Sequence, residues 1–378
     1  MRSKIYIFVF FLALAEAFLF SVNSPYIASI ISGELVGVVY SMASIVAIIL
    51  LGVLPFFIRR AGPGEILVAL LLTGALAAFI VAQGGGTWTL GALVIFLALP
   101  QVAPAVSDIF IESSSKIRER GKVIGSEFSF MNLAFVIAPV IGGFVITKFG
   151  FSALYGIAGV TFLLAMLLSL RFTRTMSPKR LHTGNIWDGL KVVWGKGDLR
   201  FILLTQFLLQ FFFSWMVIYT PLYLISKFSL GYGSLGMIFS IMLIPYVLLE
   251  YPLGRIADSR LGEKELLAGG FVLAAITTAV IPLVSSDALW VWAVILFGTR
   301  VGAAMIESMS ATYFYKKVEA RDLNLIALFR DMRPLGYIVG PILAGVVVAK
   351  FSMASLFLIL GGVMLFGALI TTRLHDTK

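Results

Sequence analysis

The sequence predicts an all-α integral membrane protein with twelve transmembrane helices. Of its 378 residues, 60% are hydrophobic and only 13% are charged, and the mean hydropathy of +1.02 lies far above that of soluble domains. Runs of about 20 apolar residues, enough for a helix to cross a hydrocarbon core of roughly 30 Å, recur from Ile5 to Thr372. They lack the alternating polarity of a membrane β-barrel, so a helical bundle is favoured.

Each apolar run is assigned one span. The first run is longer than the apolar core of a secretory signal peptide and is not closed by a small-residue cleavage site, so it is the first span. The expected spans are 5–28, 35–58, 64–83, 88–113, 122–146, 152–172, 201–225, 234–254, 265–284, 289–313, 324–349 and 353–372.

The net charge of +10 is explained by membrane topology. With both termini in the cytosol, twenty-three Lys and Arg residues fall in cytosolic segments, and only Lys148, Lys227 and Lys350 fall outside. We therefore expect a multi-pass protein of the cytoplasmic membrane, in contact with lipid and without a nucleic-acid partner. We expect it to be a monomer.

Metal and thiol chemistry is not expected. The chain has no cysteine, so it forms neither disulfides nor thiolate metal sites. Its two histidines, His182 and His375, lie in expected loops, so the sequence predicts neither a metal nor a cofactor.

An internal repeat divides the chain into two halves. FVIAPVIGGFVITKF (135–149) and YIVGPILAGVVVAKF (337–351) align without gaps at an offset of 202 with five identities, and Gly52 and Gly254 share that offset. The expected domains are a six-helix bundle over 1–172, a cytosolic linker with an amphipathic helix over 173–200, and a second six-helix bundle over 201–378.

The loop GRIADSRLGEK (254–264) resembles the signature loop of the major facilitator superfamily, and the resemblance extends over nearly the whole chain. It implies a secondary transporter whose spans 1, 4, 7 and 10 line a central cavity, and a cytosolic gate in which Asp258 meets the start of span 5 near Lys122. The first half departs from this pattern, because Phe56 stands where the aspartate would be. The loop residues assigned to the gate are Gly254, Arg255, Asp258, Arg260, Gly262 and Lys264.

Two proline-glycine patterns, GxxxGPxxAG at 336–345 and AxxxAPxxGG at 134–143, resemble the superfamily's signature for spans 11 and 5. The span 5 form is associated with antiporters, which implies export, although close helix packing explains the pattern equally well. Prolines inside spans also produce kinks. The residues assigned to packing and kinks are Pro139, Gly142, Gly143, Gly336, Gly340, Pro341 and Gly345.

Glu16 and Arg300 are the deepest charges in the expected spans, and a charge at this depth needs a partner, water or both. Glu16 is assigned to proton coupling, with Asp108 as a second proton site; the alternatives for Glu16 are recognition of a cationic substrate and static pairing with Arg300. Arg300 cannot deprotonate, so it pairs with Glu307 or another internal carboxylate, or binds an anionic group of the substrate.

Other polar residues share helical faces within the spans and indicate a wet interior. The substrate-cavity set is Glu16, Asn23, Gln101, Gln206, Gln210, Arg300 and Glu307. A second set, Glu127, Arg330, Asp331 and Arg333, is assigned to a salt-bridge network at the cytosolic gate.

The sequence lacks the GxxxxGK[ST], GxSxG and HExxH motifs, which argues against an ATP-driven pump and against an enzyme. The expected function is secondary transport of a small solute by alternating access, as proton-coupled export. Proton-coupled uptake of a small organic anion through Arg300 and a transport-inactive receptor or scaffold are the alternatives.

Overall fold

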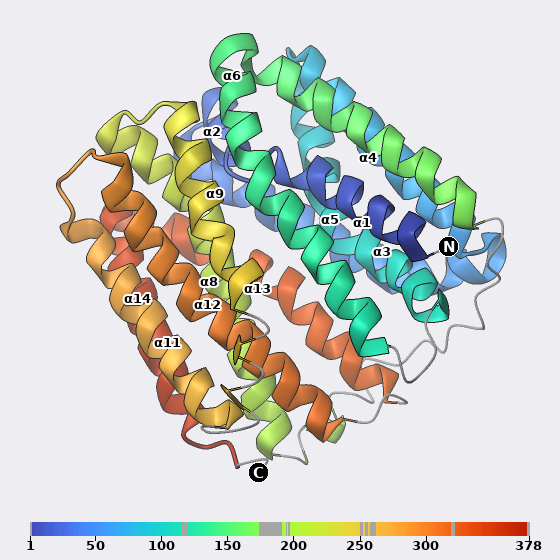
Figure 1. Cartoon of the computed structure of the whole chain (residues 1–378). Helices are drawn as coiled ribbons and strands as arrows, with labels where there is room; N and C mark the ends of the chain where they lie inside the picture. Colours follow the sequence, from blue (N-terminus) through green and yellow to red (C-terminus); the bar gives the residue numbers. More distant parts are fainter. Residues whose placement is uncertain are drawn as a thin grey trace. The chain divides into compact units, whose positions relative to one another are not determined.

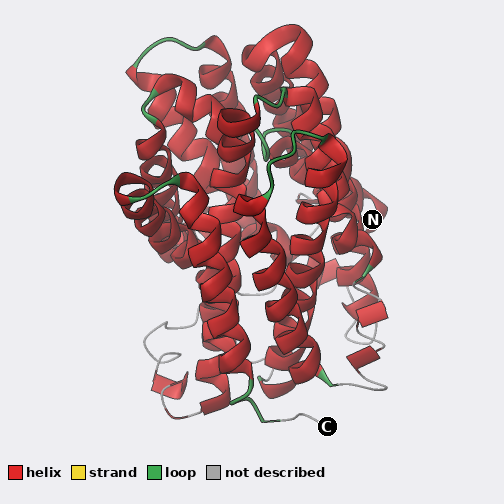
Figure 2. Cartoon of the chain, turned by 90° about the vertical axis from the view of Figure 1, so that its left-hand side faces the viewer, coloured by secondary structure: helices red, strands yellow, loops and turns green. Residues whose placement is uncertain are grey.

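The computed structural model describes residues 2–114, 120–173, 191–193, 195, 197–249, 252–253, 256–257, 262–318 and 322–375. All regular secondary structure in these residues is helical (Figures 1 and 2). In this part of the chain nine helices are long and apolar enough to cross a membrane. One of them, Glu127–Thr173, covers two expected spans, and the shorter apolar helices Ile5–Ala17 and Tyr232–Leu248 occupy the remaining two. The prediction of an all-α membrane protein is therefore confirmed.

The chain forms two compact units. The first unit contains Met1–Leu181 and Gly231–Ser240, and the second contains His182–Leu230 and Ile241–Lys378. Helix α9 (Tyr232–Leu248) therefore contributes its first turns to the first unit and its remainder to the second.

The first unit is built mainly from the N-terminal helices. In its longest helix, α6, Gly150 has a φ of 79° and interrupts the helical backbone between the two expected spans, a conformation that glycine adopts without steric cost. The helices are α1 (Arg2–Ala17), α2 (Asn23–Ile30), η1 (Gly33–Leu35), α3 (Val36–Ala61), α4 (Pro63–Gln83), α5 (Thr87–Ser114) and α6 (Arg120–Thr173).

The second unit is built around α8, which is buried along most of its length. Besides the end of α9, its helices are α8 (Gly197–Phe228), α11 (Glu263–Val280), η3 (Ile281–Leu283), α12 (Leu289–Lys317), α13 (Leu323–Lys350) and α14 (Met353–Thr371).

The same helix pairs pack together in both units. In the first unit α1 packs on α6, and α4 packs on α5 and α6; in the second, α8 packs on α13, and α11 packs on α12 and α14. Each pair in one unit corresponds to the pair six spans later in the other, which is the packing expected of a duplicated six-helix bundle. Bulky apolar side chains such as Leu76, Val294 and Leu369 remain exposed, as lipid-facing side chains do.

The first expected span is not one continuous helix. Helix α1 ends at Ala17 and α2 begins at Asn23, and the turn between them is closed by short-range bonds such as Leu19 N to Glu16 O at 3.2 Å and Val22 N to Leu19 O at 3.0 Å. The expectation that residues 5–28 form a single helix is therefore wrong. A seven-residue spacing across such a turn does not place Glu16 and Asn23 on one helical face.

Candidate functional site

The break between α1 and α2 gathers polar groups inside the first unit. Glu16 lies in the last turn of α1 and is half-buried. The hydroxyl groups of Ser21 and Ser24 are fully buried, and neither has a hydrogen-bond partner among the described residues. Irregular backbone at membrane depth is tolerated where it lies within protein or lines a watery space, so this turn is a candidate site for a proton or a solute.

Two other polar residues of the expected cavity set are anchored in the first unit. The Tyr155 hydroxyl donates to Asn23 Oδ1 at 2.7 Å, and Asn23 is buried. Gln101 donates through Nε2 to Ser44 Oγ at 3.1 Å, while its buried Oε1 has no partner in the described part of the chain. The unused acceptor adds to the unmatched polar atoms of this unit.

Asp108 and Glu127, the other acidic residues assigned to the first unit, are far in sequence from the turn between α1 and α2. Asp108 is half-buried on α5, and Glu127 is half-buried near the start of the described side chains of α6. Both interact with neighbouring groups.

The second unit contains Arg300, a fully buried cation on α12. Its side chain is 2% exposed, and its guanidinium carbon lies 5.2 Å from the centre of the Phe213 ring on α8. Within the described residues, Nε and Nη2 have no hydrogen-bond partner. Glu307 is exposed, two helical turns further along α12.

The two glutamines of α8 are also buried in this unit. Ser310 donates to Gln206 Oε1 at 3.1 Å, which joins α12 to α8. Gln210 lies at a close approach of α13, because a Cβ added at Gly336 would meet its side chain at 2.7 Å. The second unit therefore brings Arg300, Phe213 and both glutamines onto the contact between α8 and its neighbours.

The expected packing residues lie where backbones approach one another. A Cβ at Gly142 would meet the Phe18 carbonyl oxygen at 2.6 Å, directly beside the break after α1. A Cβ at Gly143 would meet the carbonyl of Tyr232 in the α9 segment of the first unit. On α13, Gly340 lies against the side chains of Ser214 and Trp215 of α8. Pro139, Pro341 and Gly345 lie within these same helices.

Most of the expected gate loop lies outside the described residues. The loop residues outside the described part are Gly254, Arg255, Asp258 and Arg260. The side chains of Glu112 and Lys122 and most of the linker also lie outside it. Gly262, with a φ of 92°, precedes α11. In α13, Asp331 is half-buried between the exposed residues Arg330 and Arg333, and Lys264 is half-buried in the first turn of α11.

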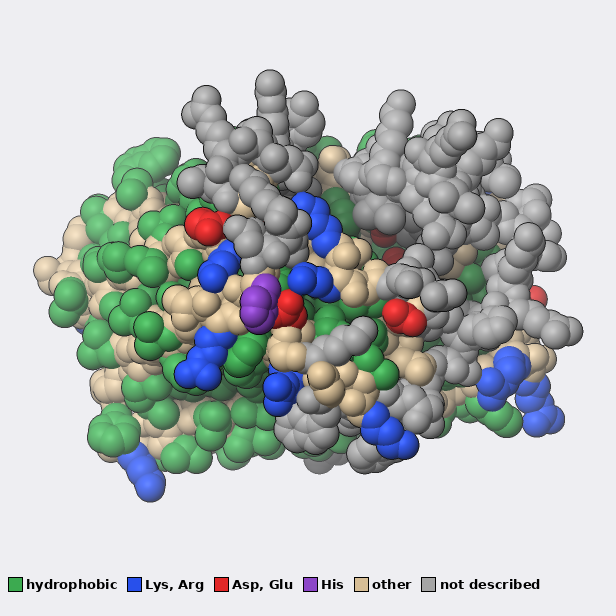
Figure 3. Space-filling model, turned by 90° about the horizontal axis from the view of Figure 1, so that it is seen from below, with side chains coloured by type: hydrophobic (Ala, Val, Ile, Leu, Met, Phe, Trp, Pro, Cys, Tyr) green, Lys and Arg blue, Asp and Glu red, His purple; other side chains and the backbone are tan. Residues whose placement is uncertain are grey.

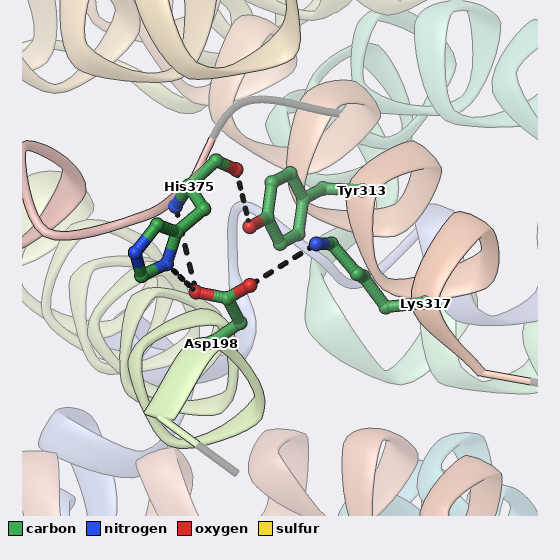
Figure 4. Close-up of polar contacts among 4 residues, drawn as sticks. All are labelled: Asp198, Tyr313, Lys317 and His375. Atoms are coloured by element: carbon green, nitrogen blue, oxygen red, sulfur yellow. Dashed lines mark hydrogen bonds and ion pairs between the residues drawn. The ribbon is translucent and has the colours of Figure 1, made fainter. Parts of the chain in front are cut away.

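A polar cluster that the sequence does not predict connects the C-terminal segment to helices of the second unit (Figure 4). Asp198 Oδ1 accepts a hydrogen bond from His375 Nδ1 at 2.8 Å, and Lys317 Nζ donates to Oδ2 at 3.1 Å. The Tyr313 hydroxyl donates to the His375 backbone carbonyl at 2.7 Å. Next to this cluster, Lys316 forms an ion pair with the buried Glu263. The residues are spread over 178 positions of the sequence, so no local motif reveals them.

The cluster borders a hollow of about 310 Å³ that is lined by Gly197, Asp198, Leu199, Lys317 and His375. Figure 3 shows a histidine side chain (purple) beside acidic and basic side chains (red and blue) on this face. Burial alone raises the pKa of the Asp198 carboxyl, but hydrogen bonds from His375 and Lys317 outweigh burial and hold that pKa below its usual value. Asp198 precedes the expected span 201–225, so this network lies at the end of the bundle.

Among the described residues, no three His, Asp or Glu side chains come together as a metal site would require. In the described part of the chain, the groups available for chemistry are carboxylates, amides and the buried guanidinium of Arg300 within apolar helices. Two units of apolar helices with related packing and buried polar side chains define a polytopic helical membrane protein, an architecture that many secondary transporters share.

The chain belongs to the major facilitator superfamily, whose sequence profile matches residues 5–325 and 223–377. Its fold is similar to that of a bacterial homologue of the human lysosomal transporter Spinster, solved in an inward-facing, unoccupied conformation. The TM-score is 0.74 at 12% sequence identity, over 98% of this chain and 94% of the other. At this identity the likeness concerns the fold alone. No curated protein matches the sequence.

Proposed function

We propose that the protein is a proton-coupled secondary transporter that exports a small amphipathic solute by alternating access. Membership of the superfamily supports secondary transport. The observation that carries proton coupling is the position of Glu16, a half-buried carboxyl group in the last turn of α1, beside the break at 18–22.

The surroundings of Glu16 suit a group that exchanges a proton. The C-terminal end of a helix carries partial negative charge, which disfavours a permanent second negative charge in the same place. A carboxyl group inside the membrane is also far from bulk water, so its charged form is costly. Glu16 interacts with a neighbouring group in this structure. Glu16 therefore takes up a proton from one side and releases it when the environment changes in the other state.

The break after α1 gives a physical route for that change. Discontinuous helices occur at the ion and substrate sites of many transporters, and here the short turn replaces part of the regular helical ladder by bonds to the third residue back, such as Phe20 N to Ala17 O. The buried hydroxyls of Ser21 and Ser24 have unused hydrogen-bonding capacity among the described residues. A rearrangement of this turn would alter the access of Glu16 to water without disturbing the rest of α1.

The moving bodies, the gate, the second proton site and the topology are proposed from the sequence. The bundles 1–172 and 201–378 move as the two bodies of alternating access, and the loop 254–264 together with Glu127, Arg330, Asp331 and Arg333 forms the cytosolic gate. Asp108 serves as a second proton site. We propose that the protein is a monomer in the cytoplasmic membrane with both termini in the cytosol.

A flux measurement tests this function. The purified protein would be reconstituted in proteoliposomes and supplied with naphthalene probes that carry a sulfonate, a trimethylammonium group or a neutral amide. Saturable movement of at least one probe against its gradient, driven by an imposed pH difference, is expected. If all three probes move only down their gradients or not at all, the proposed function is wrong.

A further inference from the structure

We propose that Arg300 is the recognition site for an anionic group on the substrate, a carboxylate or a phosphate, and that the Phe213 ring packs against the apolar part beside it. This inference rests on the proposed transport function and adds the chemical class of the solute, an amphipathic organic anion. It depends on the contacts of Arg300 within the second unit.

The two unpaired nitrogens of Arg300 lie on the same edge of the guanidinium group. Nε and Nη2 donate in parallel directions, and this pair matches the two oxygens of a carboxylate or of a phosphate. Neither nitrogen has a partner among the described residues, although the side chain is only 2% exposed. The second unit therefore holds a bidentate donor edge, and no acceptor in the described part of the chain lies within hydrogen-bond geometry of its two nitrogens.

An arginine in this position is costly for the protein. Its guanidinium remains charged at any physiological pH, and a buried charge that leaves two of its donor nitrogens without an acceptor among the described residues is destabilising. The ring of Phe213, 5.2 Å from the guanidinium carbon, offsets part of this cost through a cation–π contact. A ring face, however, cannot accept hydrogen bonds from the N–H edge that lies in the guanidinium plane.

The backbone of α12 fixes the direction of Arg300. Gly298 and Gly302 lie two residues to either side, and Cβ atoms added there would meet Thr277 at 2.9 Å and Ala274 at 2.6 Å, so this side of α12 packs closely on α11. Two residues correspond to roughly 200° around a helix. Arg300 therefore projects from the opposite side, toward α8 and Phe213.

The charges near Arg300 leave the site positive. The Tyr246 hydroxyl is a hydrogen-bonding neighbour of Arg300 and also interacts with Glu307. The Tyr337 hydroxyl interacts electrostatically with Arg300, Glu307 and Arg333. These interactions bring two cations and one carboxylate into the neighbourhood. Glu307 is exposed and two turns away from Arg300, so the positive potential at the unpaired edge favours an anion.

Phe213 indicates what the rest of the ligand contains. The ring is only half-buried, whereas its neighbours Phe211 and Phe212 on α8 are buried. An aromatic or alkyl group placed on this ring would lie next to an anion bound at the guanidinium edge. The combination selects a solute with a charged end and an apolar body.

Thermal unfolding in detergent tests the proposal without requiring transport. The comparison uses the wild type, Arg300→Met, Arg300→Lys and the matched control Lys227→Met, whose cation is paired with the Tyr223 hydroxyl at 2.7 Å. The probes are naphthalene-2-carboxylate, 2-naphthyl phosphate and the neutral naphthalene-2-carboxamide. The carboxylate and phosphate arms distinguish which anionic group the site prefers.

Without any probe, Arg300→Met should raise the Tm by about 2 °C or more, because an unmatched buried cation is removed. At least one anionic probe should raise the Tm of the wild type and of Lys227→Met, whereas the amide should not. The anionic probe should lose its effect in Arg300→Met, and Arg300→Lys should bind it at least tenfold more weakly because the bidentate edge is gone.

Three results would overturn the proposal. A lower Tm for Arg300→Met without probe means that Arg300 is a structural cation with a matched partner. An equal response of the wild type and Arg300→Met to the anionic probes places their binding elsewhere, and no response of the wild type to either anion removes the anion site. Because this assay uses no proton gradient, its outcome is separate from the coupling role of Glu16.

Discussion

The indole nitrogen of Trp215 donates a hydrogen bond to the backbone carbonyl of Gly340 at 2.7 Å. This bond joins α8 to α13 immediately before Pro341, and one turn further along α8 the Tyr219 hydroxyl donates to the Pro341 carbonyl at 3.3 Å. Proline lacks the N–H of a regular helical bond, so the helix is weakened at this point. Two side chains of α8 donate hydrogen bonds to this proline-containing part of α13.

Trp215→Phe should destabilise the protein, because the buried Gly340 carbonyl loses its side-chain donor. The expected loss is about 1 to 3 kcal/mol in the free energy of unfolding, measured by denaturant titration in a mild detergent. Trp290→Phe provides the control, since Trp290 is 70% exposed. Equal stability of the two variants would show that the Trp215 bond contributes nothing.

Gly302→Ala should separate α11 and α12. The added Cβ would lie 2.6 Å from the Ala274 nitrogen and 2.7 Å from the Gly270 carbonyl oxygen, both of them backbone atoms that cannot rotate away. Overpacking of this kind costs about 1 to 3 kcal/mol, and the Tm should fall accordingly. Gly362→Ala on α14, with no atom within 4 Å of the new Cβ, should leave the Tm unchanged. A Gly302→Ala protein as stable as that control contradicts the close approach.

Tyr155→Phe should destabilise the first unit by leaving the buried Asn23 Oδ1 without its donor at 2.7 Å. The free energy of unfolding should fall by about 1 to 3 kcal/mol. Tyr6→Phe serves as the comparison, because Tyr6 packs through its ring on Phe130 at 5.6 Å. If both variants unfold at the same denaturant concentration, the hydrogen bond between Tyr155 and Asn23 does not stabilise the protein.

Stability at acid pH should depend on Asp198. Its pKa is held below the usual value of 3.8 by His375 and Lys317, so the stabilisation is complete above pH 3.8 and is lost as the pH falls below it. The difference in Tm between the wild type and Asp198→Asn should therefore persist down to pH 5 and shrink toward pH 3. Asp287→Asn, in an exposed loop, should show no such difference. A wild-type advantage already lost at pH 5 would disagree with the lowered pKa.

Long apolar runs were sufficient to predict an all-α membrane protein. Only helices and closed β-barrels satisfy backbone groups in lipid, and the uniformly apolar segments lack the alternating polarity of barrel strands. The repeated stretch around Pro139 and Pro341 also predicted the duplicated packing, which the pairs α1–α6 and α8–α13 display. The break at 18–22 was missed, because the sequence there is as apolar as in an intact span and Pro25 lies beyond the turn.

The candidate site was predictable only in part. Charged residues such as Glu16 and Arg300 stand out in an apolar sequence. The spacing of residues along one helix also predicts which of them share a face of that helix. Contacts between helices are not encoded in spacing, so Phe213 beside Arg300, and Tyr155 beside Asn23, could not be inferred. The Asp198 and His375 pair joins positions separated by 177 residues, and both belong to segments where the apolar pattern stops.

The most direct test of the account is the pH change inside proteoliposomes when a transported naphthalene probe is added to wild-type protein, Glu16→Gln and the control Glu34→Gln. Glu34 is an exposed residue of η1. The account predicts probe-dependent proton movement for the wild type and the control, and at least a tenfold loss for Glu16→Gln, in which probe binding persists. Proton movement at the wild-type rate in Glu16→Gln would contradict it.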